Sequence, residues 1–488
     1  MERAGVKPAG TRPVVAIVGG GIAGLAAAFF LRDQPVETVV LEGSSRLGGK
    51  LLVSEVAGVP VDAGAEALLA RRPEGTDLIR EAGLDGDLVL PGTTAARIWS
   101  RGVPRSLPAR QMMGVPADLG DLARTGLLSA AGLARARREP GLPATARDGD
   151  VPVASYVAAR FGQEVVDRLV DPLLGGVYAG RSEELSFDAT LPGLAEAARS
   201  HVSLTEAAAS LLPAPGPAGA ANGAARPPVF TTLAGGLGLL PDAVAAASGA
   251  TVRTSAMVRE LARTGTGWRL TIGSAHAPEY LDADAVIVAV PGRPASRLLA
   301  GVPGAAAAAS ALGEIAYASM AIITFAYPRA AFPDPPDGSG YLVPAVDGHP
   351  VKAVTFSSVK WPHLQAQAPD LVMTRCSVGR IGEESLLQRD DEDLAAIAAR
   401  DLADATGVRG TAAGTRVTRW GGALPQYTVG HRDRVARIRA GVAAQPGLAV
   451  CGAAYDGVGI PACIATAQQA VSQILSGVRA SQPAYGQD

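Results

Sequence analysis

The sequence predicts an α/β fold, α+β overall, in which a buried parallel sheet accompanies a helical region and an antiparallel sheet. The apolar, β-branched run Val14–Val18 leads into a glycine-rich turn and then into a helical pattern over Leu25–Leu31. This order is typical of a parallel strand that is buried on both faces. A second apolar run, Val286–Val290, also ends in a glycine turn, and alternating stretches at 321–327 and 372–378 indicate antiparallel strands.

The first glycine-rich turn predicts a dinucleotide site. Gly19, Gly21 and Gly24 have G-x-G-x-x-G spacing between a strand and a helix. In such a turn the first glycine allows the tight bend, the second lets the backbone approach a pyrophosphate, and the third lets the helix pack closely. The next strand, Val36–Leu41, ends at Glu42, which would accept a hydrogen bond from a ribose hydroxyl. The candidate residues of the turn are Gly19, Gly20, Gly21, Ile22, Ala23 and Gly24.

The segment RLGGK, from Arg46 to Lys50, favours FAD over NAD. It resembles the R-x-G-G-[RK] segment of a large FAD family that includes amine oxidases, phytoene desaturases and protoporphyrinogen oxidases. Paired glycines, Gly49 among them, bring backbone amides near phosphate, and Arg46 and Lys50 supply positive charge. The sequence has no second G-x-G-x-x-G for NADPH, so we expect electrons to leave the flavin most simply to oxygen.

The remaining chain predicts a division into domains. A hairpin turns at Ala57-Gly58, residues 85–210 look largely helical, and residues 211–228 form a Pro/Gly/Ala-rich loop. A closing strand, glycine turn and helix follow Leu448, which places a second helix N-terminus near the same ligand. We expect an FAD-binding domain assembled from residues 1–84, 229–300 and 416–488, a helical domain at 85–210, and a substrate-binding sheet at 301–415.

Composition limits the function classes. A net charge of −2 gives no electrostatic argument for nucleic acid, and no stretch reads as a signal peptide or membrane span. Three widely spaced cysteines fit a reducing cytosol. We therefore expect a cytoplasmic protein, with attachment to a membrane surface left open. The five histidines form no metal motif and no serine lies in G-x-S-x-G, so we expect no metal site and nominate no catalytic acid–base pair.

Five motifs in order resemble the oxygen-dependent coproporphyrinogen and protoporphyrinogen oxidases of haem biosynthesis, especially their Gram-positive and actinobacterial form. They are the N-terminal block through VDAGAEALLARRPE, DPLLGGVYAGRSEELS, TTLAGGLGLLPDAV, LPQYTVGHRDRV and CGAAYDGVGIPACIATAQQA. The resemblance implies a Rossmann-like FAD-binding domain of the amine oxidase type. It also implies FAD-dependent oxidation of coproporphyrinogen III to coproporphyrin III, with oxygen as acceptor and hydrogen peroxide as product. Transient contact with other enzymes of the pathway is a further expectation.

The resemblance also assigns FAD contacts beyond the first turn. Val258 would pair with the adenine through its backbone, and Trp420 would lie near the flavin. Related amine oxidases attach their flavin to a cysteine soon after the equivalent tryptophan, but residues 421–432 contain none, so we expect non-covalent FAD. The remaining implied contacts are Glu42, Gly43, Arg46, Gly49, Lys50, Gly64, Ala65, Glu66, Ala67, Gly452, Val458, Gly459 and Ile460.

For the substrate, the resemblance implies a wall formed by Gly176, Val177 and Tyr178, and a propionate contact at Arg71 or Arg72. A guanidinium group suits a carboxylate because it gives two parallel hydrogen bonds. Three alternatives stay open: protoporphyrinogen IX as the substrate, an amine oxidase or carotenoid desaturase on the same fold, and a non-catalytic FAD-binding partner. The low aromatic content, 4%, disfavours the aromatic cage of an amine oxidase.

Overall fold

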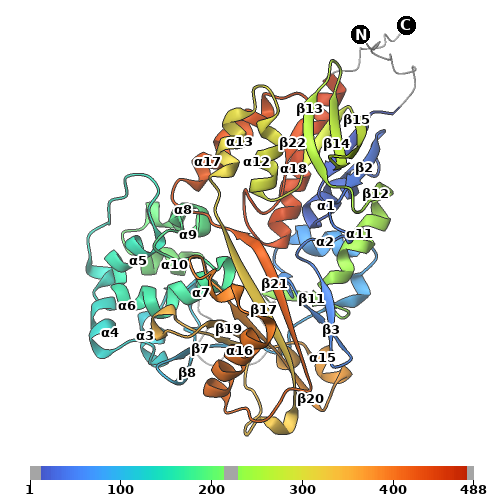
Figure 1. Cartoon of the computed structure of the whole chain (residues 1–488). Helices are drawn as coiled ribbons and strands as arrows, with labels where there is room; N and C mark the ends of the chain where they lie inside the picture. Colours follow the sequence, from blue (N-terminus) through green and yellow to red (C-terminus); the bar gives the residue numbers. More distant parts are fainter. Residues whose placement is uncertain (1–11, 214–228, 481–488) are drawn as a thin grey trace.

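The computed structural model describes residues 12–213 and 229–480. Figure 1 shows a parallel sheet with its helices at the upper right, a sheet of long strands below it, and a group of helices at the left. The parallel sheet takes strands from both ends of the chain and from its middle. Most of the predicted low-complexity loop, residues 214–228, lies outside the described residues.

The parallel sheet has the strand order β12-β2-β1-β16-β22, and every neighbouring pair is parallel. Alternate side chains of β1 enter two different cores: Val15 and Ile17 pack on one face, and Ala16 and Val18 on the other. Because both faces are covered, the strand reads as an unbroken apolar run. The strands are β12 (Thr251–Arg253), β2 (Glu37–Leu41), β1 (Val14–Val18), β16 (Ala285–Val288) and β22 (Leu448–Val450).

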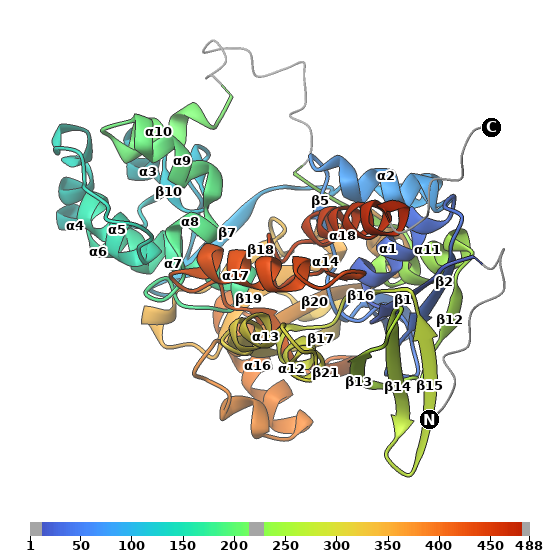
Figure 2. The ribbon, with the colours of Figure 1, turned by 90° about the horizontal axis from the view of Figure 1, so that it is seen from above.

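Helices cover both faces of this sheet, as Figure 2 shows from above. One face carries α1 (Ile22–Leu31), α2 (Pro73–Glu81), α11 (Leu240–Ser248) and α18 (Ile460–Ala480). The other carries α12 (Gly292–Ala300), α13 (Ala306–Gly313) and α17 (His431–Ala443), together with the sheet β13 (Val258–Arg263), β14 (Trp268–Ser274) and β15 (Ala277–Ala283). The predicted α/β class is confirmed.

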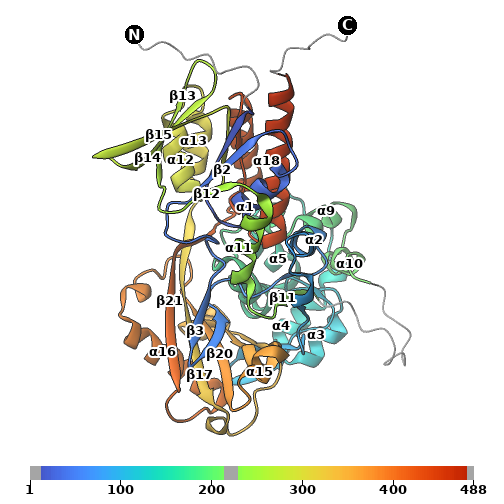
Figure 3. The same cartoon turned by 90° about the vertical axis from the view of Figure 1, so that its right-hand side faces the viewer.

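The second large sheet has seven strands in the order β21-β17-β20-β19-β18-β7-β8. Its pairs are antiparallel except β18 with β7, and α16 (Asp391–Thr406) packs on one face. Figures 1 and 3 show β17 and β21 running from this sheet up to the parallel sheet. The strands are β21 (Gly414–Pro425), β17 (Tyr317–Pro328), β20 (Leu371–Val378), β19 (Val351–Phe356), β18 (Gly340–Leu342), β7 (Ala96–Ser100) and β8 (Val103–Ser106).

Two expected boundaries need correction. The sequence predicts a largely helical region over 85–210, but five short strands lie within residues 88–116, and two of them, β7 and β8, join the seven-stranded sheet. The turn between them, Arg101-Gly102, has φ of +54° and +72°, which is the backbone of a tight hairpin turn. The boundary expected at 415 falls inside β21, because this strand continues to Pro425 as the partner of β17.

The remaining elements are short. The helices of the left-hand group are α3 (Leu119–Thr125), α4 (Ala130–Ala136), α5 (Val153–Phe161), α6 (Gln163–Val165), α7 (Asp171–Tyr178), α8 (Phe187–Thr190), α9 (Pro192–Ser200) and α10 (Leu204–Ser210). Two further short helices, α14 (Ser357–Lys360) and α15 (Pro362–Gln367), pack against β20 of the seven-stranded sheet. The small strands are β3 (Val53–Val56), β4 (Val59–Asp62), β5 (Leu68–Leu69), β6 (Leu88–Val89), β9 (Gln111–Met112), β10 (Val115–Pro116) and β11 (Phe230–Leu233).

Candidate functional site

The glycines of the first turn divide into two kinds. Gly19 has φ of +113°, and a Cβ on Gly24 would overlap the carbonyl oxygen of Gly19, so both are required by the chain itself. A Cβ on Gly21 would meet no atom of the described residues within 4 Å. Gly21 therefore faces open space in front of the first turn of α1, whose Ile22 and Ala23 amides have no helical partner. This arrangement fits the approach of a phosphate.

Glu42 stands at the end of β2, beside this turn. Its carboxylate accepts hydrogen bonds from the amides of Gly20 at 2.7 Å and Ser44 at 2.8 Å. The amide of Ala256 bonds to the carbonyl oxygen of Glu42 at 2.8 Å. A Cβ on Gly43 would meet the side chain of Met257, which lies next to Val258. The structure thus brings Glu42, Gly43 and Val258 together.

The segment from Arg46 to Lys50 lies directly against the first turn. The Gly48 amide bonds to the Gly20 carbonyl oxygen at 2.8 Å, and a Cβ on Gly49 would lie 3.4 Å from Gly21 Cα. The two cations differ. The Arg46 guanidinium donates to carbonyl oxygens of its own loop, at Leu47, Gly49 and Leu51. Within the described chain Lys50 has no ion pair, and burial lowers its pKa.

Gly64 lies where three candidate residues meet. A Cβ on Gly64 would overlap the carbonyl oxygen of Lys50 and lie 3.2 Å from Trp420 Cζ2. The Ala65 amide bonds to that same carbonyl oxygen at 3.1 Å, and the Trp420 indole donates to the Ala63 carbonyl oxygen at 2.9 Å. Trp420 is therefore oriented by the backbone of the loop beside Lys50.

The turn between β22 and α18 completes the site. Gly452 has φ of +120°, and a Cβ there would lie 3.8 Å from Ala23 Cβ, in the first turn of α1. Val458 and Gly459 lead into Ile460, the first residue of α18. The turn before α18 therefore lies against the first turn of α1, and the two helices pack together (Figures 1 and 2). Two helix N-termini, the glycine-rich turn Gly19–Gly24 and the acidic Glu42 after a strand form a site that fits the binding of a dinucleotide.

Comparison with known proteins agrees with this geometry. The family of flavin-containing amine oxidoreductases matches residues 22–475. This chain belongs to that family. It is 38% identical to the coproporphyrinogen III oxidase of Mycobacterium tuberculosis over 470 residues, covering 95% of this chain and 98% of the relative. It is 32% identical to that of Bacillus subtilis, with the same coverage. The structure of a candidate protoporphyrinogen oxidase from Exiguobacterium sp. 255-15 superposes with a TM-score of 0.82 at 30% identity, covering 95% and 98% of the two chains.

Membership of the flavin-containing family confirms that the chain is an FAD-dependent oxidoreductase of the amine oxidase fold. Among residues 12–213 and 229–480, no cluster of three His, Cys, Asp or Glu residues could hold a metal ion. No helix in these ranges is long and apolar enough to cross a membrane.

Glu66 carries a role that local sequence could not show. Its carboxylate pairs with Lys360 at 2.6 Å and with Arg375, whose guanidinium also donates to the Gly64 carbonyl oxygen at 2.6 Å. Burial alone would raise the pKa of Glu66, but Lys360 and Arg375 outweigh it and lower its pKa to about 2. Glu66 is therefore ionised at neutral pH. It links the loop Gly64–Ala67 to Lys360 of α14 and to Arg375 of the seven-stranded sheet.

A small cavity of about 20 Å³ lies behind this ion pair. Asp62 and Arg375 line it, together with residues whose buried polar atoms have no hydrogen-bond partner in the described protein. Burial raises the pKa of Asp62 to about 6, although Arg375 opposes the shift. The polar atoms are Thr232 Oγ1, Ser357 Oγ, Trp361 Nε1, His363 Nδ1 and Arg375 Nε.

The residues expected to contact substrate lie on two elements. Gly176, Val177 and Tyr178 end α7, where a Cβ on Gly176 would lie 3.3 Å from Leu342 of β18. Val177 is 40% exposed, whereas Tyr178 is buried, which raises its pKa to about 12. Arg71 is exposed just before α2. Arg72 pairs with Glu74 at 2.6 Å, so its guanidinium already has an anionic partner.

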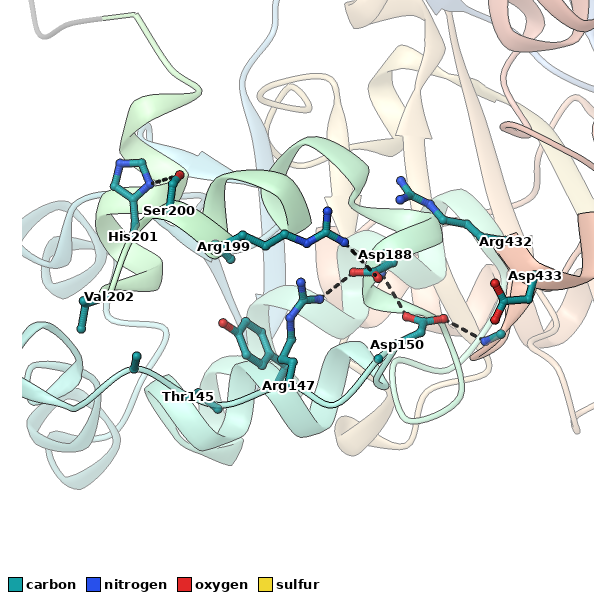
Figure 4. Close-up of a pocket in the computed structure, with 15 residues that line it drawn as sticks. Thr145, Arg147, Asp150, Asp188, Arg199, Ser200, His201, Val202, Arg432 and Asp433 are labelled. Carbon is teal, nitrogen blue, oxygen red and sulfur yellow. Dashed lines mark hydrogen bonds and ion pairs between the residues drawn. The ribbon is translucent and has the colours of Figure 1, made fainter. Parts of the chain in front are cut away.

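A larger cavity, of about 760 Å³, lies apart from these residues, between the end of α9 and the beginning of α17 (Figure 4). Three of its charged side chains, Arg147, Asp188 and Arg199, already pair with one another. Asp188 binds Arg147 at 2.6 Å and Arg199 at 3.7 Å, and Asp150 accepts from the Gly430 amide at 2.8 Å. No predicted site residue lines it.

Sequence reasoning missed two side chains that hold the turn before α18. The Tyr427 hydroxyl bonds to the backbone of Ala453 and Gly457, and His431 contacts the carbonyl oxygen of Tyr455. Both lie in the motif LPQYTVGHRDRV, which contributed to the family resemblance without any residue being singled out. Two polar aromatic residues four positions apart in one motif were the available signal.

Proposed function

We propose that this chain oxidises coproporphyrinogen III to coproporphyrin III, with oxygen as the electron acceptor and hydrogen peroxide as the product, in haem biosynthesis. The observation that carries the proposal is similarity over 95% of the chain to relatives named coproporphyrinogen III oxidase, at 38% and 32% identity. The similarity covers the motifs at Asp171–Ser186 and Leu424–Val435, which are more specific than the dinucleotide turn.

The reaction requires three two-electron oxidations of a reduced macrocycle, each of which reduces one oxygen molecule to peroxide. Bound FAD supplies the hydride acceptor and the route of electrons to oxygen. The protein holds the macrocycle in place, excludes water and provides cationic partners for its propionates. Because FAD carries out the hydride transfer and the protein only binds and orients the substrate, no side-chain acid or base is required, and we propose none.

For FAD, we propose that the first turn and the start of α1 hold the pyrophosphate and that Glu42 accepts from the ribose. Gly43 and Val258 would face the adenine. Lys50 has no anionic partner in the described chain and lies beside Gly64 and Trp420, which supports a contact with the flavin for all three. Arg46 and Gly49 would shape the phosphate-side loop. The flavin side would be completed by Ala65, Glu66, Ala67, Gly452, Val458, Gly459 and Ile460. Residues 421–432, which follow Trp420, contain no cysteine, which supports non-covalent attachment.

For the substrate, we propose that α7 forms one wall of the cleft through Gly176, Val177 and Tyr178. The partly exposed Val177 beside two glycines supports an apolar surface for the macrocycle. Arg71 and Arg72 remain the proposed propionate partners. Arg72 would have to share its guanidinium between a propionate and Glu74.

Protoporphyrinogen IX is the second candidate substrate, because the superposed Exiguobacterium protein bears that activity in its name. An amine or carotenoid substrate and a non-catalytic role are less well supported, since the relatives at 38% and 32% identity carry the coproporphyrinogen name. A cytoplasmic location, attachment to a membrane surface and transient contact with other enzymes of haem biosynthesis are further parts of the proposal, which fractionation and co-purification test.

The deciding experiment incubates the FAD-loaded chain aerobically with coproporphyrinogen III and, in parallel, with protoporphyrinogen IX. Porphyrin fluorescence and peroxide are measured against an enzyme-free control for autoxidation. We expect coproporphyrin III to appear faster, with three peroxides per porphyrin. Fluorescence no faster than autoxidation with both substrates would overturn the proposal. Faster oxidation of protoporphyrinogen IX would favour the second candidate. Reduced enzyme should not be rapidly reoxidised by NADP⁺ without oxygen.

A further inference from the structure

One short segment connects the helical group to the turn before α18. The linking segment, Gln426–His431, runs from the end of β21 to the first residue of α17. On the helical side, the Ser186 amide bonds to the Tyr427 carbonyl oxygen at 2.7 Å, and the Gly430 amide bonds to Asp150 at 2.8 Å. The Gln426 amide group donates to the carbonyl oxygen of Tyr178, the last residue of α7, at 2.8 Å. The linking segment is therefore fixed to the proposed substrate wall.

The same segment holds the turn before α18 by three backbone groups. The Tyr427 hydroxyl donates to the Ala453 carbonyl oxygen at 2.7 Å and accepts from the Gly457 amide at 2.8 Å. His431 Nε2 lies 3.0 Å from the Tyr455 carbonyl oxygen. A carbonyl oxygen can only accept, so Nε2 carries the proton. Alternate residues of one turn are thus bound by two side chains.

The two side chains also support each other. The rings of Tyr427 and His431 stack with their centroids 3.8 Å apart and an interplanar angle of 14°. Burial lowers the pKa of His431 to about 4, so the imidazole is neutral at pH 7. On its other side, Tyr427 lies 5.6 Å from the ring of Tyr178. A continuous contact path therefore runs from Tyr178 through Tyr427 to the turn that leads into α18.

We propose that Tyr427 is a positioning residue that transmits the position of α7 to the turn Gly452–Gly459. A porphyrin against α7 then alters the surroundings of the flavin through this path. The inference rests on the proposed function, which places the porphyrin at α7 and the flavin at this turn. Tyr427 is not a catalytic residue, because it is 1% exposed and both of its hydroxyl hydrogen bonds go to backbone.

The test is the substitution Tyr427→Phe, which keeps the ring, its stack on His431 and its contact with Tyr178. It removes both hydrogen bonds to the turn. Tyr455→Phe is the matched control, because it makes the same chemical change in the same turn. The Tyr455 hydroxyl is buried without a hydrogen-bond partner in the described protein.

Two quantities are measured on each FAD-loaded protein. The first is the dissociation constant of FAD, from flavin fluorescence. The second is the flavin difference spectrum produced by saturating coproporphyrin III, together with the dissociation constant of that porphyrin. For Tyr427→Phe we expect FAD affinity about tenfold weaker and the difference spectrum reduced by half or more, with porphyrin affinity within threefold of wild type. Tyr455→Phe should stay within twofold of wild type in both quantities.

The inference is overturned if Tyr427→Phe keeps the wild-type difference spectrum, or if Tyr455→Phe loses as much of it. It is also overturned if coproporphyrin III binds the wild-type protein without changing the flavin spectrum. If Tyr427→Phe does not fold, Tyr178→Leu carries the test, since it removes the ring contact between α7 and Tyr427 and leaves the Tyr427 hydrogen bonds to the turn in place. A wild-type difference spectrum at saturating coproporphyrin III in Tyr178→Leu would then count against the proposal. A wild-type chain that binds the porphyrin but oxidises no porphyrinogen would instead refute the proposed function.

Discussion

The parallel sheet and the seven-stranded sheet meet at the candidate site, and they contribute to it in opposite ways. The parallel sheet contributes backbone from its glycine-rich turn. Gly19 and Gly24 leave no room for a side chain, and Gly21 faces open space. The seven-stranded sheet and α14 contribute buried charge, because Arg375 and Lys360 reach across to Glu66. We therefore expect the glycine turn of the parallel sheet to be sensitive to an added side-chain atom. We expect the charged region around Glu66 to be sensitive to the removal of a charge.

The largest effect is expected at the charged side, from Glu66→Gln. Its side chain is 13% exposed, and the substitution leaves Arg375 and Lys360 buried beside a neutral group. The free energy of unfolding should fall by about 3–5 kcal/mol, measured by urea denaturation of the apoprotein. The control is Glu74→Gln, which removes the partner of the 43% exposed Arg72 and should change stability by about 0–1 kcal/mol. Equal losses in both variants would show that burial does not distinguish the two pairs.

A smaller effect, on the order of 2–3 kcal/mol, is expected from the ionisation of Asp62. The folded state keeps its proton up to a pKa of about 6, whereas an unfolded Asp ionises near 3.9. The contribution of Asp62 to stability is therefore fully present below about pH 4 and is lost as pH rises to about 6.

Measuring unfolding of wild type and Asp62→Asn between pH 4 and 8 tests this expectation. The stability of Asp62→Asn relative to wild type should improve as pH rises. Glu66 stays ionised in the folded state across this window because its pKa there is about 2, and its ionisation in the unfolded state is common to both proteins. His431, with a pKa of about 4, titrates in the opposite sense, but it does so equally in both proteins. A constant difference between the two proteins would contradict a raised pKa for Asp62.

At the backbone side, Gly24→Ala should destabilise the apoprotein by about 1–3 kcal/mol, because the new Cβ overlaps the Gly19 carbonyl oxygen. Gly21→Ala is the matched variant. Its Cβ would meet nothing within 4 Å among the described residues, so the apoprotein should melt as wild type does. Its FAD affinity should nevertheless fall, since the methyl group occupies the proposed path of the pyrophosphate. Normal FAD affinity in Gly21→Ala would place the phosphates elsewhere.

The smallest effect on folding is expected from Arg72→Ala, within about 1 kcal/mol, because its pair with Glu74 is partly exposed. KM for coproporphyrinogen III should nevertheless rise by about tenfold, from the loss of a charge-assisted hydrogen bond. FAD affinity should not change. Arg71→Ala is compared in the same assay. Unaltered KM in both variants would place the propionate site on another element.

The difference between the two sheets also explains which parts of the fold and of the candidate site could be predicted from the sequence. The turn Gly19–Gly24, Glu42 and β1 are encoded locally, and the structure reproduces their arrangement. The ion pairs of Glu66 join residues 294 and 309 positions apart, and no local pattern announces such partners. The strands β7 and β8 were missed because their only local signal was the Arg101-Gly102 turn. Tyr427 bonds a backbone oxygen 26 residues away, which a motif alone does not reveal.

The assembly of the parallel sheet from distant segments has a consequence for biosynthesis. Strand β22 pairs with β16, and Gly452 lies against Ala23 at the other end of the chain. At about 5–20 residues per second, a ribosome delivers β22 roughly 20–90 s after β1. Throughout that interval the nascent turn Gly19–Gly24 lacks the neighbour that α18 provides. Capture of the flavin should therefore be a post-translational event, and a chain truncated before Leu448 should leave the ribosome without it.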